Sequence, residues 1–258
     1  MSSVFITGAS RGIGRALATE FGRRGHRVVA TARDPRTLAD LDVDARLALD
    51  VTDDASVTAA VAAAGDVDIL ISNAGLIFYA AVEATPLPEL QRLLNLNAVG
   101  AIRVAQAVLP GMRARGGGKL LFMSSVMGRL VLPPGAAYAA TKWALEALVE
   151  ALAIEVAPHG VQAALLEPGA VSSGALDDVT TYTLPDDPYA AILRNGGPRA
   201  GLMTPQRVAT EVADAAERPD LPLRIPVGDA ARAVLAARRA APDDAPFDAA
   251  AAAGESAA

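Results

Sequence analysis

With 258 residues, of which 52% are hydrophobic, the chain is long enough to bury a full core and is most simply one domain. Its net charge of −6 argues against a nucleic acid as the main partner, and the lack of cysteine excludes disulfides, thiol nucleophiles and sulfur-ligated metals. His26 and His159 are isolated and have no second ligand at metal spacing, so no metal site is predicted. The sequence has neither a charged leader with a cleavage site nor an uninterrupted apolar span of about 20 residues. We therefore expect a cytoplasmic protein with no membrane partner.

The first residues predict a nucleotide-binding turn between a strand and a helix. Val4–Thr7 is a short apolar run, the helical pattern of Arg15–Arg24 follows, and a glycine-rich segment separates them. Glycines let the backbone approach a pyrophosphate closely, and the positive end of a helix stabilises its charge. Strand, loop and helix thus occur in the order that a dinucleotide site requires. The predicted cofactor contacts here are Thr7, Gly8, Ser10, Arg11, Gly12, Ile13 and Gly14.

The second predicted strand, Arg27–Thr31, bears on which dinucleotide is bound. An acidic residue just after this strand would bind the adenosine ribose hydroxyls of NAD, but Ala32 and Arg33 stand there. Arg11 and Arg33 suit the 2′-phosphate of NADP(H), because a guanidinium can bind a phosphate with two hydrogen bonds. The alternative is that both arginines are simply solvated, and the neighbouring Asp34 keeps it open. We predict NADP(H) as the cofactor.

Strands and helices continue to alternate along the chain. Arg46–Leu49 and Asp68–Ile71 read as strands, and Ala55–Ala64 between them reads as a short helix. Apolar strands that alternate with helices predict an α/β fold with a doubly wound parallel sheet. Ligands bind beyond the carboxyl ends of the strands of such a sheet. The candidates for cofactor binding at those positions are Asp50, Val51, Asn73, Ala74 and Gly75.

Tyr138 and Lys142 form the pair most suggestive of chemistry. Lys142 is one of only two lysines, beside 21 arginines, and a compact ammonium can sit beside a phenol as a guanidinium cannot. Residues 133–135 break the chain before the helical pattern Ala136–Ile154, so the pair shares a face in the first turns of that helix. We expect the ammonium and the helix N-terminus to lower the tyrosine pKa from about 10, as suits a proton donor to a carbonyl or an acceptor from an alcohol. The YxxxK spacing also arises by chance, so its meaning depends on the remaining motifs.

A buried strand, Leu120–Met123, leads into Ser124 and Ser125. Their hydroxyl groups are therefore expected at the same sheet edge as the cofactor.

Together, these segments resemble the classical short-chain dehydrogenase/reductase family. The resemblance runs from about Val4 to Gly169 and more loosely to Gly228. Each motif is modest, but their joint order and spacing is specific. The motifs are TGASRGIG (Thr7–Gly14), SNAG (Ser72–Gly75), LNLNAVG (Leu94–Gly100), MSSVMG (Met123–Gly128), YAATK (Tyr138–Lys142) and EPGAVSS (Glu167–Ser173). The resemblance implies a single-domain Rossmann fold with a parallel seven-stranded sheet flanked by helices.

The resemblance also implies roles for the catalytic residues. Tyr138 would be the acid/base, and Lys142 would bind the nicotinamide ribose and lower the tyrosine pKa. Ser125, thirteen residues before Tyr138, would hold the substrate oxygen, with Ser124 as second choice. Asn97 would hold a kinked helix and a water that relays protons to Lys142.

The resemblance also implies that four residues of the EPGAVSS motif complete the cofactor site: Pro168, Gly169, Val171 and Ser173. The family usually has Thr where Ser173 stands and Asn where Ser72 stands. Neither departure removes a catalytic position.

The C-terminal third is expected to carry the substrate site. Residues 174–203 read as a lid. Seven apolar residues from the lid and from two earlier segments predict either an apolar pocket or ordinary lid packing: Leu176, Tyr182, Leu184, Tyr189, Leu130, Leu132 and Phe78. Thr204–Glu217 reads as a helix with Thr204 as its cap, and Leu223–Val227 reads as the last strand. The run PLRIPVGDAAR resembles the hydroxysteroid and retinol dehydrogenase-like branch. We expect the domain to span residues 1–240 and residues 241–258 to be a disordered tail.

The predicted activity is NADP(H)-dependent hydride transfer to or from a small apolar ketone, aldehyde or secondary alcohol. Two alternatives stay open: an epimerase or dehydratase on the same fold, and an NADP(H)-binding sensor without turnover. The resemblance further implies a homodimer or homotetramer built through the helices Leu87–Arg115 and Tyr138–Ala157. The residues themselves do not indicate substrate identity or reaction direction.

Overall fold

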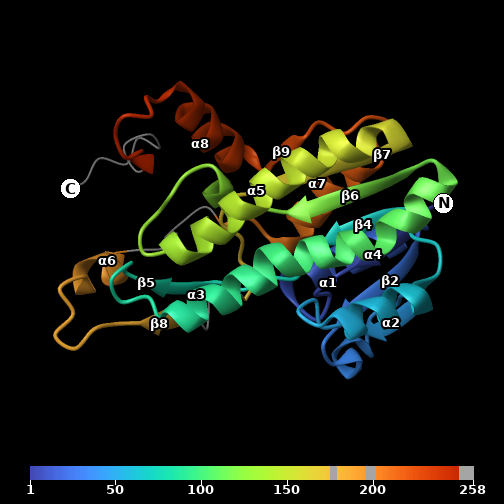
Figure 1. Ribbon diagram of the computed structural model, residues 1–258, viewed down its shortest axis with the longest axis horizontal. Helices are drawn as coiled ribbons and strands as arrows, with labels where there is room; N and C mark the ends of the chain where they lie inside the picture. Colours follow the sequence, from blue (N-terminus) through green and yellow to red (C-terminus); the bar gives the residue numbers. More distant parts are fainter. Residues whose placement is uncertain (175–178, 196–201, 250–258) are drawn as a thin grey trace.

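A computed structural model describes residues 1–174, 179–195 and 202–249, which build a parallel sheet with helices on both faces (Figure 1). Neighbouring strands pair in parallel throughout. This confirms the predicted doubly wound seven-stranded sheet. The strand order is β3 (Ala45–Ala48), β2 (Arg27–Ala32), β1 (Ser3–Ile6), β4 (Ile69–Ser72), β6 (Gly118–Met123), β7 (Val161–Pro168) and β9 (Arg224–Val227). The order reverses between β1 and β4, which is where ligands bind in such sheets.

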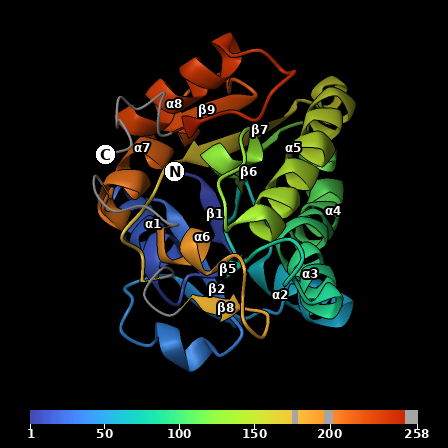
Figure 2. The same cartoon turned by 90° about the vertical axis from the view of Figure 1, so that its left-hand side faces the viewer.

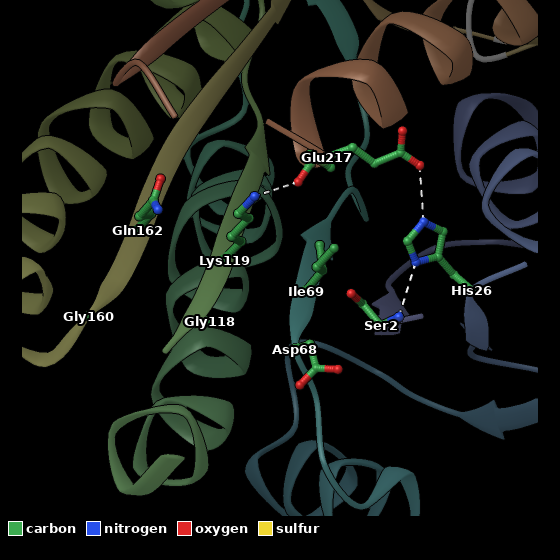
Figure 3. A pocket seen from close by; sticks show the side chains of 10 residues that line it. Ser2, His26, Asp68, Ile69, Gly118, Lys119, Gly160, Gln162 and Glu217 are labelled. Atoms are coloured by element: carbon green, nitrogen blue, oxygen red, sulfur yellow. Dashed lines mark hydrogen bonds and ion pairs between the residues drawn. The ribbon is translucent and has the colours of Figure 1, made fainter. Parts of the chain in front are cut away.

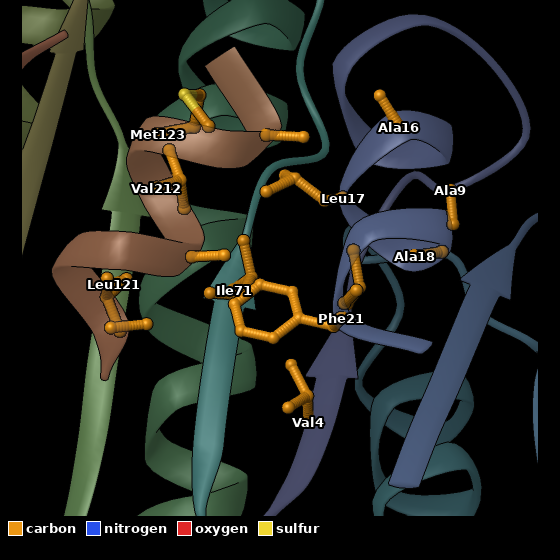
Figure 4. Packing of buried hydrophobic residues seen from close by; sticks show 14 of the residues in the cluster. Val4, Ala9, Ala16, Leu17, Ala18, Phe21, Ile71, Leu121, Met123 and Val212 are labelled. Atoms are coloured by element: carbon orange, nitrogen blue, oxygen red, sulfur yellow. The ribbon is translucent and has the colours of Figure 1, made fainter. Parts of the chain in front are cut away.

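Two apolar layers cover the two faces of the sheet, because successive residues of a strand point to opposite sides. In β1, Val4 and Ile6 enter one core and Phe5 enters the other. The first layer is closed by α1 (Gly12–Arg23) and α7 (Pro205–Ala216), whose Leu17, Phe21 and Val212 meet Val4, Ile71 and Leu121 (Figure 4). The second layer is closed by α2 (Asp54–Ala64), α4 (Gly100–Arg115) and α5 (Ala136–Val156). Figure 2 shows α1 and α7 on one side of the sheet and α4 and α5 on the other.

A wide turn interrupts the long helix that crosses the second face. α3 (Leu87–Leu94) continues through a π-helical segment, Asn95–Val99, into α4. The whole helix, Leu87–Arg115, is long and apolar enough by length and composition to cross a membrane, and 44% of its most apolar window is buried in this fold. The core helices of soluble proteins pass the same test, so this helix is weak evidence for a membrane span.

A small second sheet lies beyond the carboxyl ends of the main strands, and the sequence patterns do not predict it. β5 (Phe78–Ala80) pairs in parallel with β8 (Thr180–Tyr182), and α6 (Ala190–Asn195) follows in the same region (Figure 1). The predicted lid, residues 174–203, is described only at 174, 179–195 and 202–203. We propose that the described part of the lid covers the substrate.

The helix after the lid, α7, begins at the predicted cap residue, Thr204. The Thr204 hydroxyl accepts a hydrogen bond from the Arg207 amide, 3.2 Å away, at the start of α7. After α8 (Asp229–Ala240), Phe247 packs beside Leu235 and Leu130, and the Arg238 guanidinium lies 5.8 Å from its ring centroid. Residues 241–249 thus include a packed aromatic side chain, whereas residues 250–258 of the predicted tail lie outside the described part of the chain.

Candidate active site

The predicted site residues gather at the carboxyl edge of the sheet, most of them in the segments at the ends of six of its strands. Thr7 to Gly14 follow β1, Arg33 follows β2, Asp50 and Val51 follow β3, Asn73 to Gly75 follow β4, and Ser125 follows β6. Pro168 ends β7, with Gly169, Val171 and Ser173 behind it. Asn97 lies in the π-helical segment, and Tyr138 and Lys142 lie in the first two turns of α5.

The glycine loop is held by hydrogen bonds to the turn after β4. The buried Thr7 hydroxyl accepts from the backbone amides of Asn73 and Ala74, each 2.9 Å away. The Asn73 side-chain amide donates to the carbonyl oxygens of Thr7 (3.0 Å) and Gly8 (3.2 Å). Asn73 therefore acts here as a brace that fixes the loop.

The glycine loop is packed closely against the neighbouring backbone at the start of α1. A Cβ atom at Gly14 would lie 2.2 Å from the Gly8 carbonyl oxygen, and one at Gly12 would lie 2.7 Å from the Ser173 carbonyl oxygen. Gly8 and Gly12 also have positive φ values of 70° and 57°, which favour glycine. The Arg11 side chain makes no capping hydrogen bond to the first turn of α1. These features fit a pyrophosphate at the helix N-terminus.

The wide turn in the long helix points Asn97 into the protein. Its Oδ1 accepts from the Leu76 amide (2.9 Å), and its Nδ2 donates to the Leu76 carbonyl (2.8 Å) and to the Thr141 hydroxyl (3.0 Å). The Thr141 hydroxyl in turn donates to the Tyr138 carbonyl oxygen, 2.8 Å away. Asn97 therefore links the turn after β4 to the helix of Tyr138. Thr141 was not predicted from the sequence, since a threonine inside a helix carries no signal of this role.

Ser125, Tyr138 and Lys142 are brought together by β6 and α5. Ser125 caps a short 3-10 turn, Val126–Gly128, where its hydroxyl accepts from the Met127 amide at 3.1 Å, and it also lies within hydrogen-bonding reach of the Tyr138 phenol. The Lys142 Nζ lies 5.5 Å from the centroid of the Tyr138 ring. Ser124 points elsewhere, because its hydroxyl donates to the Glu146 carboxylate at 2.6 Å. The geometry therefore favours Ser125 over Ser124.

The expected lowering of the tyrosine pKa is wrong for this structure. Burial raises the Tyr138 pKa to about 12, and the hydrogen bond from Ser125 offsets only part of that effect. Burial lowers the Lys142 pKa to about 8, against the attraction of Glu146. The prediction considered the positive charge of Lys142 near the phenol, but it did not consider the loss of hydration of Tyr138 and Lys142 on burial.

The lid meets the site beside Tyr138. Phe78 and Tyr182 contact edge to face, with ring centroids 5.2 Å apart, in a small apolar cluster that includes Leu93, Ala137 and Tyr138. Leu130, also predicted for the pocket, instead packs against α8, and the predicted Leu176 lies outside the described residues. The segment after β7 is linked to the end of the lid, since the Ser172 amide donates to the Met203 carbonyl at 2.9 Å.

A separate hollow of about 350 Å³ lies at the opposite edge of the sheet, lined by His26, Lys119, Gln162 and Glu217 (Figure 3). The Lys119 ammonium donates to the carbonyl oxygens of Ala216 (2.8 Å) and Arg218 at the end of α7. The His26 ring pairs with Glu217, 3.1 Å away. These contacts hold α7 onto the sheet, far from the gathered site residues.

Comparisons with known proteins find relatives along most of the chain. A family model described as short chain dehydrogenase matches residues 2–182. The chain is 33% identical over 242 residues to oxidoreductase BOA17 of Botryotinia fuckeliana, covering 87% of this chain and 88% of that protein. It is 39% identical over 192 residues to human 17-beta-hydroxysteroid dehydrogenase type 1, covering 68% of this chain and 58% of that protein.

Solved structures of short-chain dehydrogenases share this fold. A short-chain dehydrogenase from Streptomyces avermitilis superposes with a TM-score of 0.81 at 34% identity, covering 93% of this chain and 94% of that one. A short-chain dehydrogenase from Burkholderia cenocepacia in complex with NADP superposes with a TM-score of 0.78 at 25% identity, covering 93% of each chain.

Proposed function

The chain belongs to the short-chain dehydrogenase family, and we propose that it is an NADP(H)-dependent oxidoreductase acting on an apolar ketone, aldehyde or secondary alcohol. The observation that carries the proposal is the convergence of Ser125, Tyr138 and Lys142 at the same sheet edge as the glycine loop. Bound nicotinamide would supply the hydride in reduction and accept it in oxidation.

The chain's own residues would handle the oxygen atom and its proton. In reduction, the Tyr138 hydroxyl would give its proton to the carbonyl oxygen, and the Ser125 hydroxyl would donate a hydrogen bond to the same atom. A raised pKa suits this direction, because it keeps the phenol protonated at neutral pH. Asn97 would keep α5 in register with the turn after β4, through Thr141.

The preference for NADP(H) is supported by the residues after β2. Arg33 is exposed there, whereas the carboxylate of Asp34 accepts from the Arg36 amide and pairs with the Arg36 guanidinium at 2.8 Å. An acid held by an arginine competes poorly for ribose hydroxyls, and an exposed guanidinium suits a 2′-phosphate. Arg11 lies in the glycine loop and is also exposed. The Burkholderia structure binds NADP, which agrees with this preference.

An apolar substrate is supported by the side chains around Tyr138. Phe78, Leu93 and Tyr182 present mostly carbon to this region. The relatives include proteins named for steroid and retinol substrates, the human 17-beta-hydroxysteroid dehydrogenase type 1 and human retinol dehydrogenase 8. We extend only the apolar class to this chain.

We also propose a cytoplasmic homodimer or homotetramer assembled through the outer face of α5. Trp143, Leu148 and Ile154 are 46%, 45% and 74% exposed on that face, and exposed apolar patches commonly mark protein–protein contacts. Light scattering coupled to size exclusion would test the assembly, and Ile154→Glu would be expected to shift it toward monomer.

The activity is tested by following NADPH consumption with a panel of apolar ketones, aldehydes and quinones, in parallel with Tyr138→Phe and with NADH. We expect turnover with NADPH, a loss of at least about 100-fold in Tyr138→Phe, and unchanged NADPH binding in that variant. Tight NADPH binding with no turnover on any carbonyl would instead support the sensor alternative.

A further inference from the structure

Glu146 is a buried acid that the roles described above do not use. Its side chain is among the buried polar groups, 4% exposed, and it lies on α5 one turn after Lys142 and two turns after Tyr138. At this four-residue spacing the three side chains follow one side of the helix. A buried carboxylate needs hydrogen-bond donors or positive charge nearby, so its partners indicate its purpose.

Both carboxylate oxygens of Glu146 have partners. Oε1 accepts from the hydroxyl of Ser124, which is 1% exposed, at 2.6 Å, and Oε2 accepts from Nε of Arg224 in β9 at 2.8 Å. The two oxygens therefore accept hydrogen bonds from residues of two different segments. Glu146 thus connects α5 with the end of β6 and with the last strand of the sheet.

The bond between Ser124 and Glu146 lies directly under the turn that carries Ser125. Gly128 closes that turn, and a Cβ atom there would lie 2.7 Å from the Ser124 Oγ and 2.9 Å from the Glu146 Cγ. On the other side of Ser124, the Met123 carbonyl accepts from the Lys142 ammonium at 2.7 Å. α5 therefore holds the segment before Ser125 at two successive residues.

Glu146 also acts on Lys142 by charge. Its attraction opposes the burial that lowers the Lys142 pKa to about 8. Other ionisable groups near this pair come from several elements. They are Tyr138 and Glu150 on α5, Tyr79 on β5, Glu167 on β7, Arg224 on β9 and Arg129 after the short turn.

We propose that Glu146 is a positioning residue that fixes the turn of Ser125 through Ser124 and keeps the ammonium of Lys142 charged. The proposal rests on the proposed hydride transfer for its catalytic consequence. Its electrostatic part concerns the folded protein alone and can be measured without turnover.

The two lysines of the chain make that measurement direct. Protein labelled with carbon-13 at the lysine ε-carbon should give two side-chain signals, and Lys119→Arg assigns them. In Glu146→Gln, which keeps the shape and removes the charge, we expect the Lys142 titration to move about one pH unit lower. Glu150→Gln is the matched control, because Glu150 binds the same guanidinium from the same helix at 2.5 Å but is half exposed and does not contact Ser124. It should leave the Lys142 titration in place.

Turnover then separates the two roles of Glu146. Ser124→Ala keeps the charge and removes the hydrogen bond, so we expect kcat to fall about tenfold while the KM for NADPH and the Lys142 titration stay unchanged. Glu146→Asp should restore the Lys142 titration and leave kcat low, because its shorter side chain keeps the charge and loses the reach. In Glu146→Gln, the alkaline fall of reductive activity should move to lower pH with the Lys142 signal.

The proposal is overturned if folded Glu146→Gln matches Glu150→Gln in both the Lys142 titration and kcat. If Glu146→Gln does not fold, an unchanged kcat in Ser124→Ala overturns the positioning role. A wild-type protein without turnover would contradict the proposed function alone, since the lysine titration still decides the effect of Glu146 on Lys142.

Discussion

The ammonium of Lys142 donates a hydrogen bond to the carbonyl oxygen of Met123, 2.7 Å away. This bond ties α5 to the end of β6 and sets the ammonium beside the Tyr138 ring without a direct bond to the phenol. Burial moves the Tyr138 pKa up to about 12 and the Lys142 pKa down to about 8.

These shifts predict opposite pH dependences for the two reaction directions. Reduction needs the neutral phenol and the ammonium, so its kcat/KM should be level below about pH 8 and fall above it, as Lys142 loses its proton. Oxidation needs the phenol to accept a proton, so its rate should rise with pH until Lys142 deprotonates. Initial rates in both directions between about pH 6 and pH 10 would check this. A reductive rate that rises through pH 8 would contradict it.

Arg33 is expected to discriminate between the two nicotinamide cofactors. In Arg33→Ala, the KM for NADPH should rise about 10-fold to 100-fold, while the KM for NADH should change little, because only NADPH carries the 2′-phosphate. Arg113→Ala, an exposed arginine near the end of α4, serves as control and should change neither value. Equal losses with both cofactors would show that Arg33 does not bind the 2′-phosphate.

Gly14 should tolerate no side chain, although alanine is the better helix former. In Gly14→Ala, the new Cβ would meet the Gly8 carbonyl oxygen at 2.2 Å, so we expect a loss of about 1–3 kcal/mol in the free energy of unfolding and weak NADPH binding. Gly22→Ala is the control in the same helix, where the nearest atom, the Asp42 carbonyl oxygen, lies at an ordinary 3.5 Å. That variant should be neutral or more stable by up to about 1 kcal/mol. Urea unfolding and NADPH fluorescence would measure both, and equal behaviour of the two variants would contradict the steric argument.

The sequence predicted those parts of the fold that local chemistry determines. The central strands β1, β4 and β6 are largely apolar runs, and Thr204 with Pro205 at the next position marks a helix start that the structure confirms. β5 and β8 were missed because each has three residues and their pairing depends on where the lid returns. Phe247 was missed because its partner, Leu235, belongs to another element.

Within the site, the positions of the residues were more predictable than their pKa shifts. The shared edge of the parallel strands brings Ser125, Tyr138 and the glycine loop together, and sequence order alone implies that edge. Desolvation depends on every neighbour, so the direction of the Tyr138 shift could not be predicted from its spacing to Lys142. The role of Glu146 had one available signal, its four-residue spacing after Lys142.

Glu167 should make stability depend on pH in the neutral range. The side chain is 2% exposed, and its Oε1 has no hydrogen-bond partner among the described residues, although the Arg224 Nε lies 3.9 Å away. Burial, together with repulsion from Glu146, raises its pKa from 4.5 to about 7. The folded protein therefore holds a proton that the unfolded chain releases above about pH 4.5.

The direction in which stability changes with pH follows from this difference in bound protons. The stabilisation is complete below the unfolded pKa and is lost as pH rises toward the folded value of about 7, in total about 3 kcal/mol. Glu167→Gln cannot titrate, so its free energy of unfolding should not show this fall, and the variant should gain on the wild type between about pH 5 and pH 8. Glu155→Gln, at an exposed position on α5, controls for the loss of one carboxylate. Urea unfolding of the three proteins across this range would measure the difference, and parallel curves for wild type and Glu167→Gln would show that Glu167 does not hold the proton.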